Sequence, residues 1–201
     1  MKRKSRWVSV FLAMALASIT FRAQSQVTAT DIGVTYTMEH AKLESSSCSC
    51  FWLKGGSVDG AVTFYRGFGL AANLTAEHTS NIAPGENLGK VSVMAGPRYT
   101  YNTFLYIRHP LREYGMQVFG EWLVGRVHGF DSVFPGSNSV TSSAGSFSTQ
   151  LGIGTDIAIH GGFGIRPVEL DYVHTSFPNY GANSQNDLRL AFGLSYRLTA
   201  R

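Results

Sequence analysis

The most constraining feature of this chain is a pair of alternating segments between residues 146 and 175, joined by a short glycine turn. From Leu151 to Ile159 every second residue is large or β-branched, and the residues between are mostly glycine or polar. His160-Gly161-Gly162 then reverses the chain, and a second alternating segment returns. A period of two is typical of β-strands, whose successive side chains point to opposite faces. The pattern predicts an antiparallel hairpin with one apolar face and one face of small and charged side chains.

Six further segments show the same alternation, so the sequence predicts eight strands in all. The six are expected at residues 31–39, 51–65, 68–77, 91–101, 115–127 and 187–198. Long polar connections are expected after the first, third, fifth and seventh strands, within residues 44–50, 77–89, 129–145 and 177–186. Tight turns are expected at Arg66-Gly67 and at residues 160–162. Alternating long and short connections are typical of even-stranded membrane barrels.

The orientation of the apolar faces separates two kinds of barrel. Charged residues make up only 15% of the chain, below the ~25% of an ordinary soluble domain. In a membrane barrel the large residues face lipid, and glycine and charge fill the lumen. In a secreted lipocalin-like barrel the same large residues would point inward and bind an apolar ligand. We expect the first arrangement, in an all-β, eight-stranded, antiparallel, up-and-down transmembrane β-barrel.

The N-terminus predicts export. Lys2, Arg3, Lys4 and Arg6 precede an apolar run that reaches Phe21, and Ala23-Gln24-Ser25 provides a small-x-small cleavage site. This pattern is typical of a signal peptide at residues 1–25, followed by a barrel domain at 26–201. Five of the 17 basic residues would leave with the leader, so 12 would remain against 13 acidic ones, a net charge of −1. A chain of that charge gives no support to nucleic-acid binding.

A set of ionisable residues falls on the inward face of the expected strands. Because an eight-stranded barrel is just wide enough to be filled by side chains, these charges are expected to pair and plug the lumen. The predicted set is Arg98, Glu121, Asp156, Glu169, Asp171 and Arg189. A narrow pore lined by the same groups is the alternative. Pro167 is expected to cause a bulge, so the side of the strand taken by Arg166 stays open.

Several segments of the second half resemble a known family. They are GPRY (96–99), VFGEWLVG (118–125), GIGTD (152–156), RPVELDY (166–172) and the final LRLAFGLSYRL (188–198). In these the chain resembles the OmpA-like or opacity-type outer-membrane β-barrels, which are small, eight-stranded and porin-like. The resemblance implies a monomer in the cell outer membrane with a structural or adhesion-like role and no cofactor. It also implies contact with outer-membrane lipid and lipopolysaccharide, insertion by the barrel-insertion machinery, and an unidentified ligand of the outer loops.

Two short motifs raise other chemistry. Cys48 and Cys50 lie close together in the first long connection, where a strained disulfide or two free thiols is favoured over a metal pair. His174-Thr175-Ser176 suits an outer-membrane lipid A deacylase, but His78-Thr79-Ser80 repeats the tripeptide and no carboxylate follows closely. The sequence therefore predicts no enzyme and no metal site.

Overall fold

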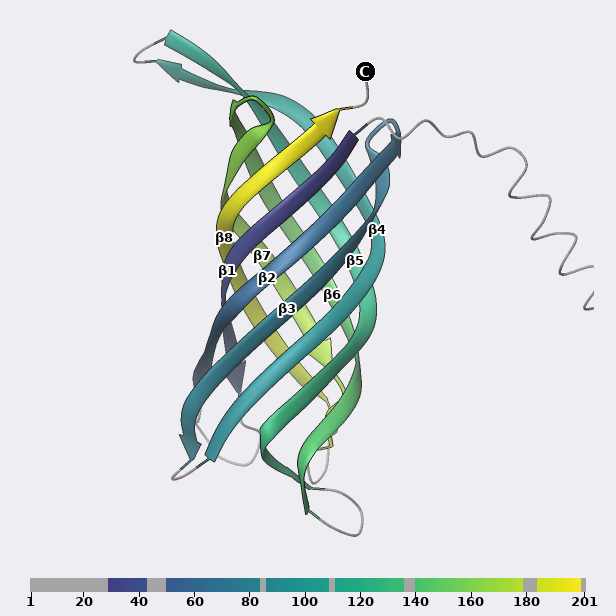
Figure 1. Ribbon diagram of the computed structural model, residues 1–201, viewed down its shortest axis with the longest axis vertical. Coiled ribbons are helices and arrows are strands. Elements are labelled where there is room, and N and C mark those ends of the chain that lie inside the picture. The colour runs from purple at the N-terminus through teal and green to yellow at the C-terminus, as the bar shows by residue number, and fades with distance from the viewer. Residues whose placement is uncertain are drawn as a thin grey trace, which may run out of the picture.

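The computed structural model describes residues 29–42, 50–83, 86–108, 111–135, 140–178 and 184–199. Eight antiparallel strands are hydrogen-bonded in sequence order, and β1 pairs with β8 to close the barrel (Figure 1). The strands are β1 Ala29–Lys42, β2 Cys50–Tyr65, β3 Phe68–Ala83, β4 Glu86–Arg108, β5 Leu111–Pro135, β6 Val140–His160, β7 Phe163–Thr175 and β8 Gln185–Thr199. The predicted fold class is thereby confirmed.

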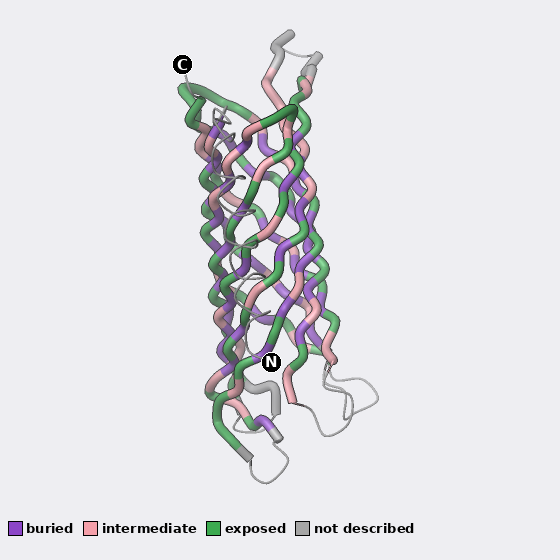
Figure 2. Tube along the Cα trace, turned by 90° about the vertical axis from the view of Figure 1, so that its right-hand side faces the viewer, coloured by how far each residue is buried: buried purple, intermediate pink, exposed green. Residues whose placement is uncertain are grey.

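Burial alternates along the strands, as the period of two requires (Figure 2). Val34, Leu151 and Leu194 are 57%, 62% and 64% exposed on the outer wall. Arg189, between the outward-facing Leu188 and Leu190, is 1% exposed and points into the lumen. The large apolar residues therefore cover the outside, which suits hydrocarbon and contradicts the lipocalin-like alternative. Among the described residues, no helix is long and apolar enough to cross a membrane.

Aromatic side chains gather at the end of the barrel where β1 begins and β8 ends, which we call the terminal end. Phe68 packs on Tyr99 and Phe163 on Tyr196, with ring centroids 4.8 and 4.6 Å apart. Tyr101 is also exposed there. Aromatic rings at this level are typical of the girdle that meets the membrane interface.

The two tight turns at the terminal end have the predicted chemistry. Arg66 and Gly67 adopt φ values of 47° and 90°, and Gly161 and Gly162 adopt 58° and 88°. Positive φ at both central residues matches the type I′ turn, whose twist fits a β-hairpin.

Two of the four connections at the opposite end, the loop end, are shorter than the sequence predicted. Residues 77–89 were expected to form a long loop, but β3 continues to Ala83 and β4 begins at Glu86. Likewise β5 and β6 extend into most of the loop expected at 129–145. The ladders continue because backbone hydrogen bonds need no apolar side chains, as in the pairing of Thr79 with Leu88. The predicted signal peptide and Cys48 lie outside the described residues, whereas Cys50 is exposed as a free thiol.

Candidate functional site

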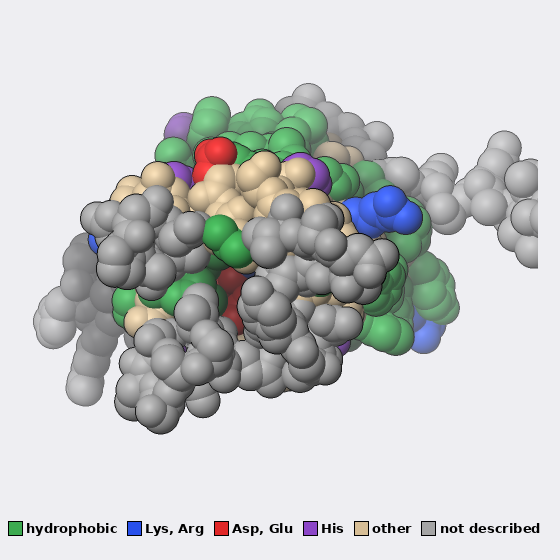
Figure 3. Space-filling view, turned by 90° about the horizontal axis from the view of Figure 1, so that it is seen from below, with side chains coloured by type: hydrophobic (Ala, Val, Ile, Leu, Met, Phe, Trp, Pro, Cys, Tyr) green, Lys and Arg blue, Asp and Glu red, His purple; other side chains and the backbone are tan. Residues whose placement is uncertain are grey.

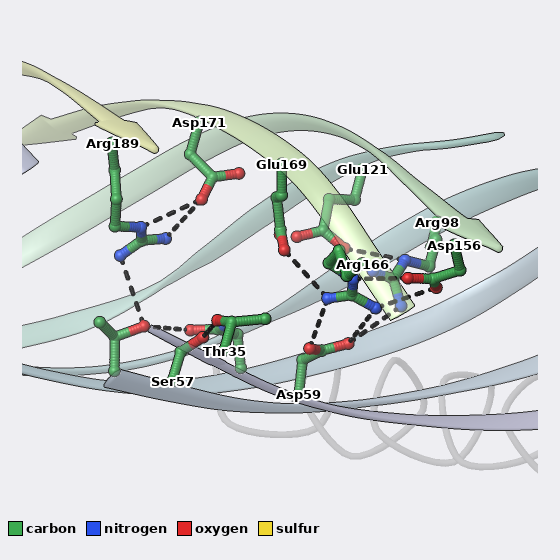
Figure 4. A network of polar contacts seen from close by, with 12 residues as sticks. Thr35, Ser57, Asp59, Arg98, Glu121, Asp156, Arg166, Glu169, Asp171 and Arg189 are labelled. Carbon is green, nitrogen blue, oxygen red and sulfur yellow. Dashed lines mark hydrogen bonds and ion pairs between the residues drawn. The ribbon is translucent and has the colours of Figure 1, made fainter. Parts of the chain in front are cut away.

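The six ionisable residues predicted for the lumen all point inward and are buried (Figure 4). They come from β4, β5, β6, β7 and β8, at positions where the neighbouring residues face outward. In the structure they form ion pairs with one another and with Asp59 and Arg166. Glu121 and Arg189 also hydrogen-bond to Gln150, and none of these three partners was predicted for the lumen set.

Arg166 is the centre of this lumen network. Its guanidinium donates to Asp59 at 2.7 Å, to Asp156 at 2.8 Å and to Glu169 at 2.9 Å, and so connects β7 with β2 across the barrel. The sequence left its side open because of Pro167, and the register of β7 against β8 does shift between Arg166 and Glu169. This bulge leaves two outward residues between two inward ones, so both Arg166 and Glu169 face the lumen.

Arg98 extends the network from β4. It lies 3.2 Å from Asp59 and 3.0 Å from Glu121, and its guanidinium stands 3.8 Å from the centre of the Phe119 ring. Arg166 lies over the same ring at 4.7 Å. The ring reaches this position because it packs against Gly154, where a Cβ would overlap it. Cation–π contacts with both arginines therefore support the ion pairs.

Arg189 bridges the barrel at the next level. It donates to Asp171 at 3.0 Å, to Gln150 Oε1 and to Thr75 at 3.4 Å, so β8 is joined to β7, β6 and β3. Asp171 and Arg189 are register partners on adjacent strands, which explains why the sequence could place them side by side.

Each end of the lumen carries a further ionic group. Toward the loop end, Lys90 forms an ion pair with Glu39 and lies 3.6 Å from Glu77, and all three side chains are buried. Toward the terminal end, Arg197 donates to Asp31 at 2.6 Å and to Asn102 at 3.0 Å, beside a cavity of about 20 Å³. Lys90 lies just outside the strand predicted from residue 91, although the inward series Met94, Ser92, Lys90 continues the period.

A belt of basic and imidazole side chains surrounds the outside of the loop end. On the odd-numbered strands, the outward apolar series ends and the next outward residue is histidine or arginine. Together with Lys54 on β2, these residues form the outer rim, which consists of His40, Lys54, His78, Arg126, His128 and His174. Lys54 and His78 are register partners, and the His40 ring packs at a tilt against Trp52, with centroids 4.9 Å apart. Figure 3, which views the loop end, shows histidine side chains at the periphery.

The two His-Thr-Ser motifs both belong to this rim. His174 Nδ1 lies 2.7 Å from Asn186 Oδ1, and the Ser176 backbone donates to Ser146 Oγ. His78 Nε2 lies 3.4 Å from Ser80 Oγ. Within the described ranges, no hydrogen bond or ion pair joins either histidine to a carboxylate. Among the described residues, neither histidine is thus oriented by an acid as in a Ser-His-Asp triad.

Solved structures with the same barrel fold are known, although sequence comparisons find no match. No family model matches the chain, and no curated protein matches it. The crystal structure of Neisserial surface protein A (NspA) matches with a TM-score of 0.62 and 12% identity, over 84% of this chain and 97% of that one. Ail, the attachment invasion locus protein of Yersinia pestis, solved in complex with the heparin analogue sucrose octasulfate, matches with a TM-score of 0.53 and 17% identity, over 85% and 98%. The chain thus has the fold of the small, eight-stranded, OmpA-like barrels of bacterial outer membranes, the family that its sequence resembles.

Proposed function

We propose that this chain is an integral outer-membrane protein whose plugged barrel is a structural anchor for a surface-interaction role, of the adhesion type, at its loop end. The observation that carries the proposal is the combination of an apolar outer wall with a lumen filled by ion pairs. In this proposal residues 1–25 direct export and are removed. The loop end then faces the outside of the cell, and the protein works as a monomer without cofactor or catalytic activity.

The filled lumen favours an anchor over a narrow pore. Ion pairs cross the lumen at more than one level, as between Arg166 on β7 and Asp59 on β2 and between Lys90 on β4 and Glu39 on β1. Paired charges that cross an eight-stranded barrel leave little room for hydrated ions. Single-channel recording of the mature protein in planar bilayers tests this. The proposal predicts no stable conductance, and reproducible open steps from monomeric barrel would favour the pore.

The outer rim supports contact with the phosphates of lipopolysaccharide. Lys54 and Arg126 are exposed just beyond the apolar wall, at the level where lipid phosphates would lie. We expect Lys54→Gln combined with Arg126→Gln to lower the amount of lipopolysaccharide that copurifies with the barrel. Arg66→Gln, at the exposed turn of the terminal end, is the matched control. Equal lipopolysaccharide in all three preparations would contradict this contact.

The outer rim and the loops next to it are the surface proposed for adhesion. Ail was solved with a sulfated heparin analogue, and the outer rim of this chain offers cationic side chains next to the loops. A sulfated polysaccharide is therefore the first ligand to test, by retention of reconstituted barrel on heparin in graded salt. If wild-type barrel and the Lys54→Gln, Arg126→Gln variant are retained equally on heparin, the rim takes no part in such binding.

A further inference from the structure

We propose that the centre of the lumen binds one divalent cation of the Ca²⁺ class, held by Glu121, Glu169 and Asp171. Each of these buried carboxylates has an oxygen that lies within 4.8 Å of an oxygen of the other two. Carboxylate oxygens are the ligands of hard cations, and Ca²⁺ binds them at about 2.3–2.6 Å. Two oxygens on opposite sides of one such ion stand about 4.6–5.2 Å apart, so the separations suit a shared Ca²⁺.

The three carboxylates each use one oxygen on an arginine. Glu121 Oε2 faces Arg98 at 3.0 Å, Glu169 Oε2 faces Arg166 at 2.9 Å, and Asp171 Oδ2 faces Arg189 at 3.0 Å. These pairs fix the orientation of the carboxyl groups, so the second oxygen of Asp171 turns toward Glu169 and Glu121 (Figure 4).

The second oxygen of Asp171 has no hydrogen-bond partner. Asp171 is 1% exposed, and its Oδ1 is buried without a donor, while Glu121 Oε1 accepts only from Gln150, at 3.2 Å. A buried carboxylate oxygen with nothing to bind is costly, and a cation between the three groups would satisfy it.

Gly152 makes room for two of the proposed carboxylate ligands. It lies on β6 between its register partners Glu121 on β5 and Asp171 on β7. A Cβ at this position would overlap Asp171 Oδ1 and lie 3.4 Å from Glu121 Oε1. The missing side chain therefore allows the Asp171 carboxylate to lie beside that of Glu121.

The charge balance of the centre gives an independent argument. In the described part of the lumen centre, five carboxylates surround three guanidinium groups. The carboxylates are Asp59, Glu121, Asp156, Glu169 and Asp171, and the cations are Arg98, Arg166 and Arg189. The centre is two positive charges short of neutrality, which is the charge of one divalent cation.

Metal analysis of refolded protein tests the proposal. Mature barrel is unfolded in urea and refolded into detergent with CaCl₂ or with a chelator. Unfolding exposes the proposed ligands, which the closed lumen shields in the folded barrel. After gel filtration in metal-free buffer, calcium is measured per mole of protein, and the temperature at which the folded band converts to the unfolded band is read from gels. We expect about one Ca²⁺ per barrel and a conversion temperature raised by several degrees.

Three variants make the test specific. Asp171→Asn removes a ligand charge, and Gly152→Ala displaces the Asp171 carboxylate without changing any charge. Both are expected to lose the bound Ca²⁺ and the Ca²⁺-dependent shift. Asp31→Asn also removes a buried carboxylate paired with an arginine, but at the terminal end. This variant should keep both the bound Ca²⁺ and the Ca²⁺-dependent rise in conversion temperature. If either site variant fails to refold, Glu121→Gln replaces it. Absence of Ca²⁺ from wild-type protein, or equal Ca²⁺ in the site variants and wild type, would overturn the proposal.

Discussion

At the scale of single residues, Arg166 carries the largest predicted effect. Replacing it by methionine would leave Asp59, Asp156 and Glu169 buried without their shared cation. Removing one member of a buried ion pair commonly costs about 3–5 kcal/mol, so we expect a loss of at least this size in the free energy of unfolding. Urea titration of barrel in detergent measures it. Arg126→Met, on the exposed outer wall, should change the same quantity by less than about 0.5 kcal/mol. Similar losses in the two variants would mean that the lumen network contributes little to stability.

Gly33 gives a second prediction at this scale. A Cβ at Gly33 would overlap Asp59 and touch Arg166, whereas a Cβ at Gly60 would meet nothing within 4 Å. Gly33→Ala should therefore lower the free energy of unfolding by about 1–3 kcal/mol, a typical cost of overpacking. Gly60→Ala, one position along in the same strand pair but on the outward face, serves as the control. Equal stability of Gly33→Ala and wild type would show that the network shifts to make room.

At the scale of elements, the two type I′ turns differ in how much they depend on glycine. Gly67 has a φ of 90°, and a Cβ there would overlap the Thr100 carbonyl, whereas Gly161 has a φ of 58° and open space around it. Gly67→Ala should therefore cost about 2 kcal/mol or more, and Gly161→Ala about 1 kcal/mol. Unfolding titrations of the two variants compare them. A larger loss in Gly161→Ala would contradict the described geometry of β2–β3.

The strands differ in how well they could be predicted from the sequence. The eight strands could be predicted because an apolar wall demands large residues at every second position, as in Leu188 to Leu198. The loop-end extensions of the strands could not be predicted, because paired residues there, such as His78 and Thr79, carry polar side chains like those of a loop. Asp171 and Arg189 were predictable from alternation alone. Arg166 was not, because the Pro167 bulge interrupts the period, and only the register shift brings its side chain inside.

At the scale of the whole molecule, the account depends on the outer wall facing hydrocarbon. Trp122 is 58% exposed on this wall, with apolar Val124 the next outward residue on β5. If residues 1–25 are removed on export, Trp52 and Trp122 are the only tryptophans left. In a mature Trp52→Phe variant, the fluorescence therefore comes from Trp122 alone.

The most direct measurement is the emission of this variant in vesicles of ordinary lipid and of lipid brominated on its acyl chains. Bromine quenches tryptophan only at close range, so a ring that faces hydrocarbon loses much of its emission in the brominated bilayer. Strong quenching of Trp122 is the result that the account predicts. Emission that is the same in the two bilayers, from protein that folds without detergent or lipid, would contradict it.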